Sequence, residues 1–343
     1  MKKYKIAIVG ATGVVGQTAL KVLEEKKLSD YEYTLFASSR SSGKKIDFMG
    51  KEYIVKELKE DSFDEIFDYA IFSAGAKTSK LFAPIAASKG CTVIDNSSAF
   101  RMDENIPLVV PEVNKDVLKN YKGIIANPNC STIQAVVALK PLHDKFKIKR
   151  IVYSTYQAVS GAGSKGIHDL ENGIKNYTDN IRNTDYLEKF PVHIFSNCIP
   201  HIDIFLENGY TKEEEKMINE TRKILGDKDI LITATTVRVP VFNSHSESIN
   251  VEFENDFESV NNIISVLQNA PGIKIIDDIS NSKYPTCIDS NGKDDVFVGR
   301  IRRDFSVKSG INLWVVADNI RKGAASNAIQ ILEELINLNK YDI

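Results

Sequence analysis

The chain has 343 residues, of which 43% are hydrophobic and 26% charged, and its formal net charge is −2. This length exceeds what one hydrophobic core usually serves, so we expect two domains. The near-neutral charge argues against a nucleic-acid surface, and no apolar run reaches the roughly 18 residues that a membrane span needs. Composition therefore predicts a two-domain globular protein, and we expect it in the cytoplasm.

The N-terminal part alternates short apolar strands with helical runs. Strands are predicted at 5–10, 33–38, 69–75, 91–97 and 123–127, and helices at 14–28 and 79–90. Strands that alternate with helices build a parallel, doubly wound sheet. The sequence thus predicts an α/β, Rossmann-type domain over residues 1–127.

A glycine-rich loop, GATGVVG, joins the first predicted strand to the first helix and contains Gly10, Gly13 and Gly16. Such a loop allows a tight turn and a close backbone approach to a pyrophosphate at the helix N-terminus. Its spacing is G-x-x-G-x-x-G rather than the commoner G-x-G-x-x-G, and a turn without a ligand is the alternative. We expect a dinucleotide to bind there.

The end of the second predicted strand bears on the choice of cofactor. An NAD site carries Asp or Glu at this point to hold the ribose 2′-hydroxyl. The chain instead reads ASSRSSGKK, with Arg40 and Ser41 and no carboxylate before Asp47. A guanidinium and hydroxyls suit a 2′-phosphate, so NADP is favoured, and a solvated basic loop is the alternative.

Cys130 stands between an Asn-Pro-Asn turn and a helical run. At a helix start the sulfur faces unpaired N–H groups and the positive end of the dipole, which favour the thiolate. A buried packing role is the alternative, and we expect that role for Cys91, Cys198 and Cys287. Beside a nicotinamide, a thiol nucleophile suggests aldehyde oxidation or acyl reduction through a thioester.

After Cys130 the predicted strands become longer and more alternating. They cover 150–161, 229–241, 247–255, 295–304 and 311–318, with helices at 211–225, 259–269 and 327–338. This pattern predicts an α+β domain over 128–321 with a mixed, largely antiparallel sheet. We expect the C-terminal helix, within 322–343, to complete the first domain. The polar stretch 171–189 receives no assignment.

Several motifs together resemble the aspartate-β-semialdehyde dehydrogenase family. They include VGATGVVGQ, NPNCSTIQ, STYQAVSGAG, VRVPVFNSHSES and LWVVADNIRKGAA, and they extend over nearly the whole chain. The family makes aspartate semialdehyde from β-aspartyl phosphate with NADPH, on the way to lysine, diaminopimelate, threonine, methionine and isoleucine. The resemblance implies an NADP-dependent oxidoreductase that assembles as a homodimer or homotetramer.

The resemblance also implies roles for individual residues. Cys130 matches the acyl-thioester nucleophile, His245 the acid/base and Gln157 the residue that positions the acyl group. Arg238 matches the ligand of the substrate carboxylate and Glu213 that of its ammonium group, with Glu214 and Glu215 as neighbouring candidates. The other matches are Arg101, Lys216 and Asn129 for substrate or phosphate, and Gly10, Thr12, Gly13, Val14, Val15, Gly16, Arg40, Ser41, Ser160, Gly161 and Asn319 for NADP.

The sequence leaves two alternatives to this predicted function. Another acyl-phosphate reductase, such as N-acetyl-γ-glutamyl-phosphate reductase, has a substrate whose acylated amine gives no reason for Glu213. A non-catalytic NADP-binding homologue is the second, and the joint presence of Cys130, Gln157, Arg238 and His245 argues against it. The separated cysteines lack the spacing of a zinc site, so no metal is expected.

Overall fold

The computed structural model describes residues 3–179 and 185–341 of the chain. They divide into two compact units, the first of Met1–Asn129 with Ala324–Ile343 and the second of Cys130–Gly323. Part of the polar stretch 171–189, namely 180–184, lies outside the described residues. Within the described ranges, no helix combines the length and the apolar character needed to cross a membrane.

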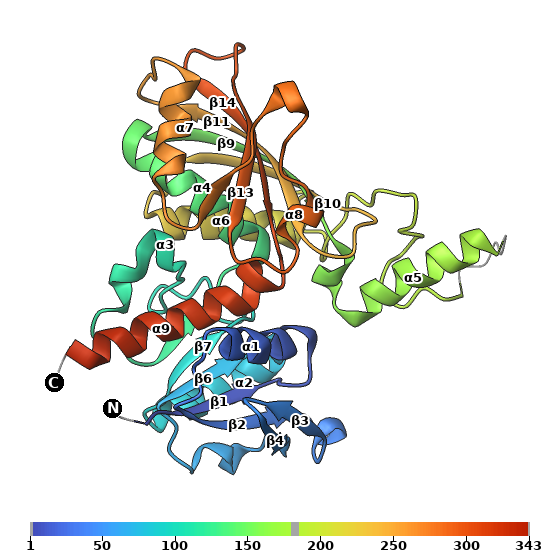
Figure 1. The fold of residues 1–343 in the computed structure, drawn as a ribbon, viewed down its shortest axis with the longest axis vertical. Helices are drawn as coiled ribbons and strands as arrows, with labels where there is room; N and C mark the ends of the chain where they lie inside the picture. Colours follow the sequence, from blue (N-terminus) through green and yellow to red (C-terminus); the bar gives the residue numbers. More distant parts are fainter. Residues whose placement is uncertain (1–2, 180–184, 342–343) are drawn as a thin grey trace. The chain divides into compact units, whose positions relative to one another are not determined.

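The first unit contains a six-stranded sheet in which every neighbouring pair of strands is parallel (Figure 1). Its order is β5-β2-β1-β6-β7-β8. The strands are β1 (Lys5–Val9), β2 (Glu32–Ala37), β5 (Lys56–Glu57), β6 (Tyr69–Phe72), β7 (Thr92–Asp95) and β8 (Ile124–Ala126). The predicted parallel, doubly wound sheet is confirmed.

Helices bury both faces of this sheet, which explains why its strands read as continuous apolar runs. All four residues of β6 are buried, and so are all four of β7. On one face, α1 (Val14–Glu25) and α9 (Ser326–Tyr341) share a core cluster, although they come from opposite ends of the chain. On the other face, α2 (Ala76–Ser88) contributes to a second cluster.

A two-stranded hairpin in this unit was not among the predicted elements. It consists of β3 (Lys45–Phe48) and β4 (Lys51–Ile54), and five of its eight strand residues are exposed. Each strand has only four residues, two of them charged, so neither gives an apolar pattern long enough for the prediction. The remaining short helices of the unit are η1 (Ser39–Ser41), η2 (Glu60–Phe63), α3 (Pro111–Asn114) and η3 (Lys115–Leu118).

The second unit contains a mixed six-stranded sheet in the order β10-β9-β11-β14-β13-β12. The three central pairs are antiparallel and the two edge pairs are parallel, as the predicted mixed, largely antiparallel sheet requires. The strands are β9 (Ile148–Gln157), β10 (Leu231–Arg238), β11 (His245–Phe253), β12 (Ile273–Ile275), β13 (Val296–Arg303) and β14 (Gly310–Ala317).

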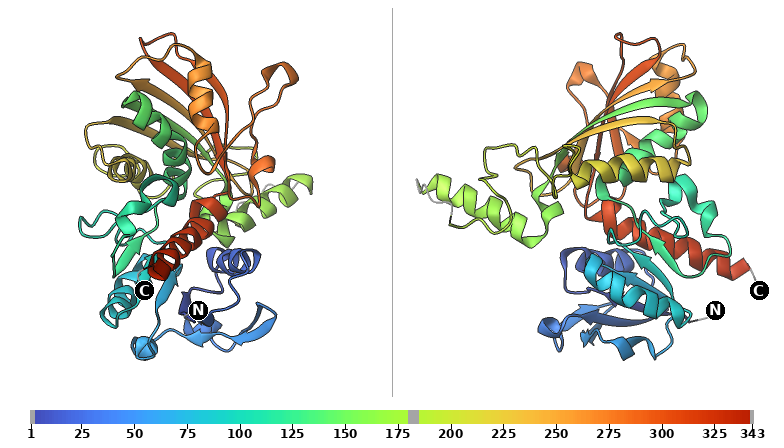
Figure 2. Two further views of the ribbon diagram at one scale, coloured as in Figure 1. Left: turned by 60° about the vertical axis from the view of Figure 1, so that its left-hand side comes forward. Right: turned by 180° about the vertical axis from the view of Figure 1, so that it is seen from behind.

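Three helices pack on one face of this sheet: α4 (Cys130–Phe146), α6 (Lys212–Leu225) and α7 (Val260–Gln268) (Figure 2). Side chains of β9 alternate between the faces, so Tyr153 and Gln157 are buried while Tyr156 is 39% exposed. The hydroxyl of Tyr153 lies 3.1 Å from that of Thr221 in α6, which identifies the helix-covered face. Residues on that face build the candidate site.

The segment after β9 holds elements that received no prediction. Helix α5 (Ser164–Thr178) extends away from the sheet (Figure 1). The short elements of the unit are η4 (Val159–Ala162), η5 (Ile279–Asn281), α8 (Cys287–Ser290) and η6 (Arg321–Ala325), the last of which continues into the first unit. The expectation that Cys198 packs in the interior is wrong, because this residue is exposed in a loop.

Candidate active site

Cys130 is the first residue of α4. The first turn of this helix holds no acidic side chain, so no carboxylate of that turn offsets the positive end of its dipole. Cys130 is half-buried, and a Cβ added to Gly323 would lie only 2.8 Å from the Cβ of Cys130. Glycine at 323 therefore lets the chain pass close to Cys130.

His245 is fully buried at the start of β11, with its imidazole held in one tautomer. Its Nδ1 accepts the backbone N–H of Ala158 at 3.0 Å, and because that group only donates, the neutral ring carries its proton on Nε2. Burial, followed by the charge of Arg238, lowers the pKa of His245 to about 3. Among the described residues Nε2 has no hydrogen-bond partner, so it is an available donor.

The backbone before His245 is held in an unusual conformation. Ser244 has φ = +75°, which is uncommon for a residue with a side chain. Its N–H donates to Oδ1 of Asn319 at 2.9 Å, and Nδ2 of Asn319 donates to Oγ of Ser160 at 3.0 Å. A Cβ on Gly161 would lie 3.2 Å from Nε2 of His245. Three residues that the resemblance assigns to NADP thus also surround or brace His245.

Arg238 ends β10 with both its backbone and its guanidinium fixed. Its N–H donates to the carbonyl of Ile199 at 2.8 Å, and Nη1 donates to the carbonyl of Ala158 at 2.6 Å. Burial lowers the pKa of Arg238, and the charges of Glu213 and Cys130 act in the opposite direction. Cys130 and Glu213 therefore both lie within electrostatic reach of Arg238.

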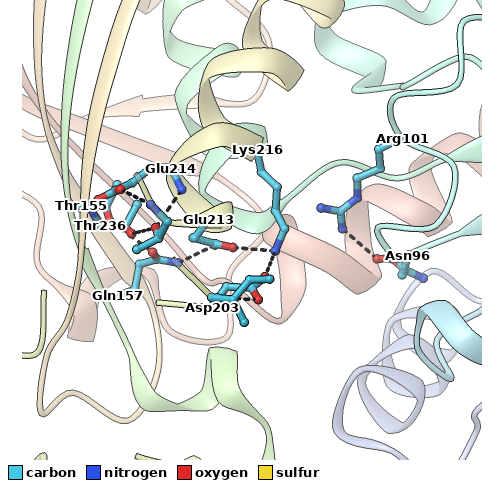
Figure 3. A network of polar contacts seen from close by, with 11 residues as sticks. Asn96, Arg101, Thr155, Gln157, Asp203, Glu213, Glu214, Lys216 and Thr236 are labelled. Carbon is cyan, nitrogen blue, oxygen red and sulfur yellow. Dashed lines mark hydrogen bonds and ion pairs between the residues drawn. The ribbon is translucent and has the colours of Figure 1, made fainter. Parts of the chain in front are cut away.

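Glu213, in the first turn of α6, connects two other predicted site residues (Figure 3). Its Oε1 accepts Nε2 of Gln157 at 3.2 Å, and its Oε2 lies 2.9 Å from Nζ of Lys216. Glu213 and Lys216 thus share one helix face, as their spacing predicts. Asp203, which the sequence did not single out, is a second partner of Lys216, at 2.8 Å.

The two neighbouring glutamates point to other partners. Glu214 forms a capping box with Thr211, whose N–H donates to its Oε2 at 2.7 Å, and Oε1 accepts the N–H of Thr236 at 2.9 Å. Glu215 accepts hydrogen bonds from Asn208 and Asn219. Of the three candidates, Glu213 is therefore the one that contacts Gln157 and Lys216.

The glycine loop of the first unit has room for a ligand at the start of α1. Gly10 has φ = +88°, and a Cβ on Gly16 would lie 2.1 Å from the carbonyl oxygen of Gly10, so both glycines serve the turn itself. Gly13 is the exposed N-cap of α1, without a side-chain cap or an acidic residue in the first turn. With the half-buried Thr12 and Val15 and the exposed Val14 beside it, this helix N-terminus fits a pyrophosphate.

The end of β2 lies beside this loop, because the N–H groups of Gly10 and Ala11 both donate to the carbonyl of Phe36, at 2.8 and 3.1 Å. Arg40 and Ser41 follow in η1, where Arg40 is exposed. Elsewhere in the first unit, Arg101 is buried and donates from Nη2 to the carbonyl of Asn96 at 2.9 Å (Figure 3). Asn129, also buried, ends the unit immediately before Cys130.

Comparison with known proteins decides the family. The family model described as semialdehyde dehydrogenase, NAD binding domain, matches residues 5–121, and that described as semialdehyde dehydrogenase, dimerisation domain, matches residues 139–322. The chain is 57% identical to aspartate-semialdehyde dehydrogenase of Aquifex aeolicus, over 97% of this chain and 98% of that protein. The chain belongs to the aspartate-semialdehyde dehydrogenase family.

Solved structures agree with this assignment. Aspartate-semialdehyde dehydrogenase II of Vibrio cholerae, complexed with ASA, is similar with a TM-score of 0.93 and 47% identity, over 98% of this chain and 99% of that one. The Candida albicans aspartate-semialdehyde dehydrogenase with NADP is similar with a TM-score of 0.77 and 27% identity, over 98% and 99%. The predicted family, fold class and oxidoreductase class are confirmed, the N-terminal unit is a nicotinamide-nucleotide domain, and N-acetyl-γ-glutamyl-phosphate reductase is not favoured.

Proposed function

We propose that this protein catalyses the reversible, NADPH-dependent reductive dephosphorylation of β-aspartyl phosphate to L-aspartate 4-semialdehyde through a thioester on Cys130. The observation that carries the proposal is the set of charges around the nucleophile in the second unit: Arg238 and Lys216 as cations and Glu213 as an anion. A substrate with an α-carboxylate, an α-ammonium and a phosphate needs this combination. The product serves the synthesis of lysine, diaminopimelate, threonine, methionine and isoleucine.

In the reductive direction, the sulfur of Cys130 attacks the acyl-phosphate carbon. The S–C bond forms, the C–O bond to phosphate breaks, and phosphate leaves toward Lys216. N–H groups at the start of α4 stabilise the oxyanion, and Gln157 orients the acyl group. Asn129, beside the nucleophile in sequence, contacts the substrate. When bound, the nicotinamide cofactor supplies the hydride that reduces the thioester carbon.

His245 assists when the S–C bond breaks and the sulfur departs. Its Nε2–H donates a hydrogen bond to the charge that develops there. Full transfer of the Nε2 proton from a neutral ring would leave an imidazolate anion. An acid/base cycle therefore requires Nδ1 to give up the hydrogen bond from Ala158 and to take a second proton. Until then His245 acts as a donor, not as a base.

The cofactor preference that we propose is for NADP. Arg40 and Ser41 follow β2, and the segment offers no carboxylate before Asp47, which suits a 2′-phosphate. Gly10, Thr12, Gly13, Val14, Val15 and Gly16 would hold the pyrophosphate, and Ser160, Gly161 and Asn319 are further candidates for contacts with the nucleotide. One structural relative, from Candida albicans, carries NADP.

We also propose a homodimer, or a tetramer built from such dimers, that acts in the cytoplasm. The face of the second sheet opposite α4 exposes Tyr156, which packs on Trp314 with ring centroids 5.4 Å apart, and Leu231 at its edge is 56% exposed. An aromatic patch on an open sheet is typical of an interface. None of the four cysteines, all of which lie within the described residues, forms a disulfide, which is consistent with a reducing compartment.

The test is NADP reduction by the purified protein with aspartate semialdehyde, with and without phosphate. We expect turnover that depends on phosphate in the unmodified protein and none in Cys130→Ala. Quenching without phosphate, followed by mass spectrometry, should show an aspartyl adduct on Cys130. An active Cys130→Ala variant, or turnover with N-acetylglutamate semialdehyde in place of aspartate semialdehyde, would contradict the proposal.

A further inference from the structure

Glu247 is a buried acidic residue for which the proposed reaction has no use. It lies two residues beyond His245 on β11 and is fully buried. Among the described residues, no donor forms a hydrogen bond with either of its carboxylate oxygens. Since buried carboxylates are normally paired with a cation or with several N–H groups, this one needs an explanation.

The described surroundings of Glu247 hold no cation that would compensate a negative charge, and Gln134 is the one group that acts in favour of the ionised form. In the sheet its neighbours are Thr155 of β9 and Val315 of β14. The titratable group that faces it from β9 is the phenol of Tyr153, and the polar group from α4 is Gln134. Burial raises the pKa of the Glu247 carboxyl well above its ordinary value, and Gln134 offsets this only in part. No charge from a described lysine, arginine or histidine contributes.

The side chain of Gln134 also has a buried oxygen that receives no hydrogen bond from the described residues. Its Nε2 donates to the backbone carbonyl of His245 at 3.4 Å, a long hydrogen bond that nevertheless fixes the orientation of the amide, since a carbonyl only accepts. Its Oε1 is buried and receives no donor from the described residues. Gln134 interacts with Glu247, and both side chains have buried oxygens without a donor among the described residues. A proton on Glu247 would supply that donor.

We propose that Glu247 is a carboxylic acid that donates its proton to Oε1 of Gln134. The resulting chain runs from Glu247 through the Gln134 amide to the backbone carbonyl of His245. It ties α4, at the residue one turn beyond Cys130, to the strand that carries His245. Glu247 is a positioning residue, and its neutral form adds no negative charge near a thiolate nucleophile.

The protonation state is tested by infrared spectroscopy on the intact protein without substrate. At neutral pH we expect a carbonyl band of a protonated carboxyl group that disappears in Glu247→Gln. Glu252→Gln is the matched control, because Glu252 lies on the same strand but forms an ion pair with Lys149 at 2.8 Å. Absence of the band in the unmodified protein, or its persistence in Glu247→Gln, would overturn the proposal.

Unfolding measurements give a second readout that does not involve activity. A carboxyl with a raised pKa is protonated when folded and ionised when unfolded, so its contribution to stability falls as the pH rises above the unfolded value. Relative to the unmodified protein, the folding equilibrium constant of Glu247→Gln should therefore gain up to about tenfold per pH unit as the pH rises above the ordinary range of a glutamate carboxyl. A difference that does not change with pH would contradict a proton on Glu247.

Measurements of kcat then show whether Glu247 positions site residues or has a purely structural role. Glu247→Gln retains an N–H donor for Gln134, whereas Glu247→Leu removes it and leaves Oε1 unpaired. We expect Glu247→Leu to lower kcat by about tenfold, the equivalent of one hydrogen bond, with an unchanged KM for phosphate, and Glu247→Gln to recover most of this loss. Equal kcat values in the two variants would refute the positioning role. Since the spectroscopic and unfolding tests need no substrate, they stand even if the proposed reaction fails.

Discussion

Among single residues, Arg238 shows most directly how the fold prepares a charge for binding. Pairing with Ile199 and β9 fixes its backbone, and Ala158 occupies one guanidinium nitrogen. Within the described residues its Nε has no hydrogen-bond partner. The guanidinium is thus oriented before the substrate arrives. The ammonium group of a lysine at this position would not be oriented in the same way.

Arg238→Lys tests this orientation. Because a lysine keeps the charge but not the two-bond fork, we expect a loss of roughly 2–4 kcal/mol in transition-state stabilisation. The measurement is kcat/KM for aspartate semialdehyde. A near-normal value would mean that charge alone is sufficient.

Asp203 is predicted to compete with phosphate for Lys216. Its carboxylate lies 2.8 Å from Nζ of Lys216 and is partly exposed. An incoming phosphate can therefore replace this carboxylate as the partner of Lys216. We expect Asp203→Asn to lower the KM for phosphate by about two- to fivefold, the scale of a partly exposed ion pair. Glu215→Gln removes a charge from the same region without touching Lys216 and should have no such effect. A raised phosphate KM in Asp203→Asn would show that Asp203 positions the lysine instead.

His245 makes the protein sensitive to acid. Its pKa falls from 6.5 to about 3 on folding, so between these values the unfolded state binds the proton and stability drops as the pH falls. His245→Asn has no titrating group, while its side-chain oxygen can still accept the N–H of Ala158. The stability of the variant relative to the unmodified protein should therefore improve by up to about 1.4 kcal/mol per pH unit below 6.5. Denaturant unfolding at pH 7 and pH 5 measures the difference, and equal differences at both would contradict a neutral His245.

At the scale of elements, α6 combines a structural cap with two site residues in its first two turns. Thr211 and Glu214 close the helix start, and Glu213 and Lys216 face the site from the same turns. Any fraying at this end therefore displaces the residues that we assign to ammonium and phosphate.

Thr211→Ala should reduce the free energy of unfolding by about 1 kcal/mol, because the N-cap hydroxyl is lost. It should also raise the KM for phosphate. Ser259 is the N-cap of α7, which carries no proposed site residue, so Ser259→Ala is the matched control with an unchanged phosphate KM. If both variants change that KM equally, the effect comes from general stability and not from the end of α6.

At the scale of the whole molecule, the nucleotide loop and the nucleophile belong to different compact units. The choice of cofactor can therefore be altered in the first unit without touching the chemistry of the second. Arg40→Asp places a carboxylate where an NAD site would have one.

We expect Arg40→Asp to lower kcat/KM for NADPH and to leave that for NADH equal or higher. Thioester formation on Cys130 should remain, because this residue lies in the other unit. Equal kcat/KM values for the two cofactors in the unmodified enzyme would remove Arg40 from the 2′-phosphate site.

The sequence by itself determined what depends on neighbouring residues. The glycine loop between β1 and α1 and the position of Cys130 at a helix start follow from turn and helix rules. Apolar runs and alternation likewise predicted both sheets, since burial on two faces or one leaves a direct mark on the sequence. The hairpin β3–β4 was not predicted, because its four-residue strands are half charged and too short to show a clear pattern.

Only the tertiary structure decided what depends on distant partners. The tautomer of His245 follows from Ala158, the second partner of Lys216 is Asp203, and the burial of Glu247 follows from the packing of the second sheet. The same holds for the distinction between Glu213 and Glu214 on helix α6. Glu214 accepts a hydrogen bond from the N–H of Thr236 on strand β10, whereas Glu213 does not share this partner. In each case the partner or the burial of a side chain depends on another segment of the chain, and no local pattern contains that information.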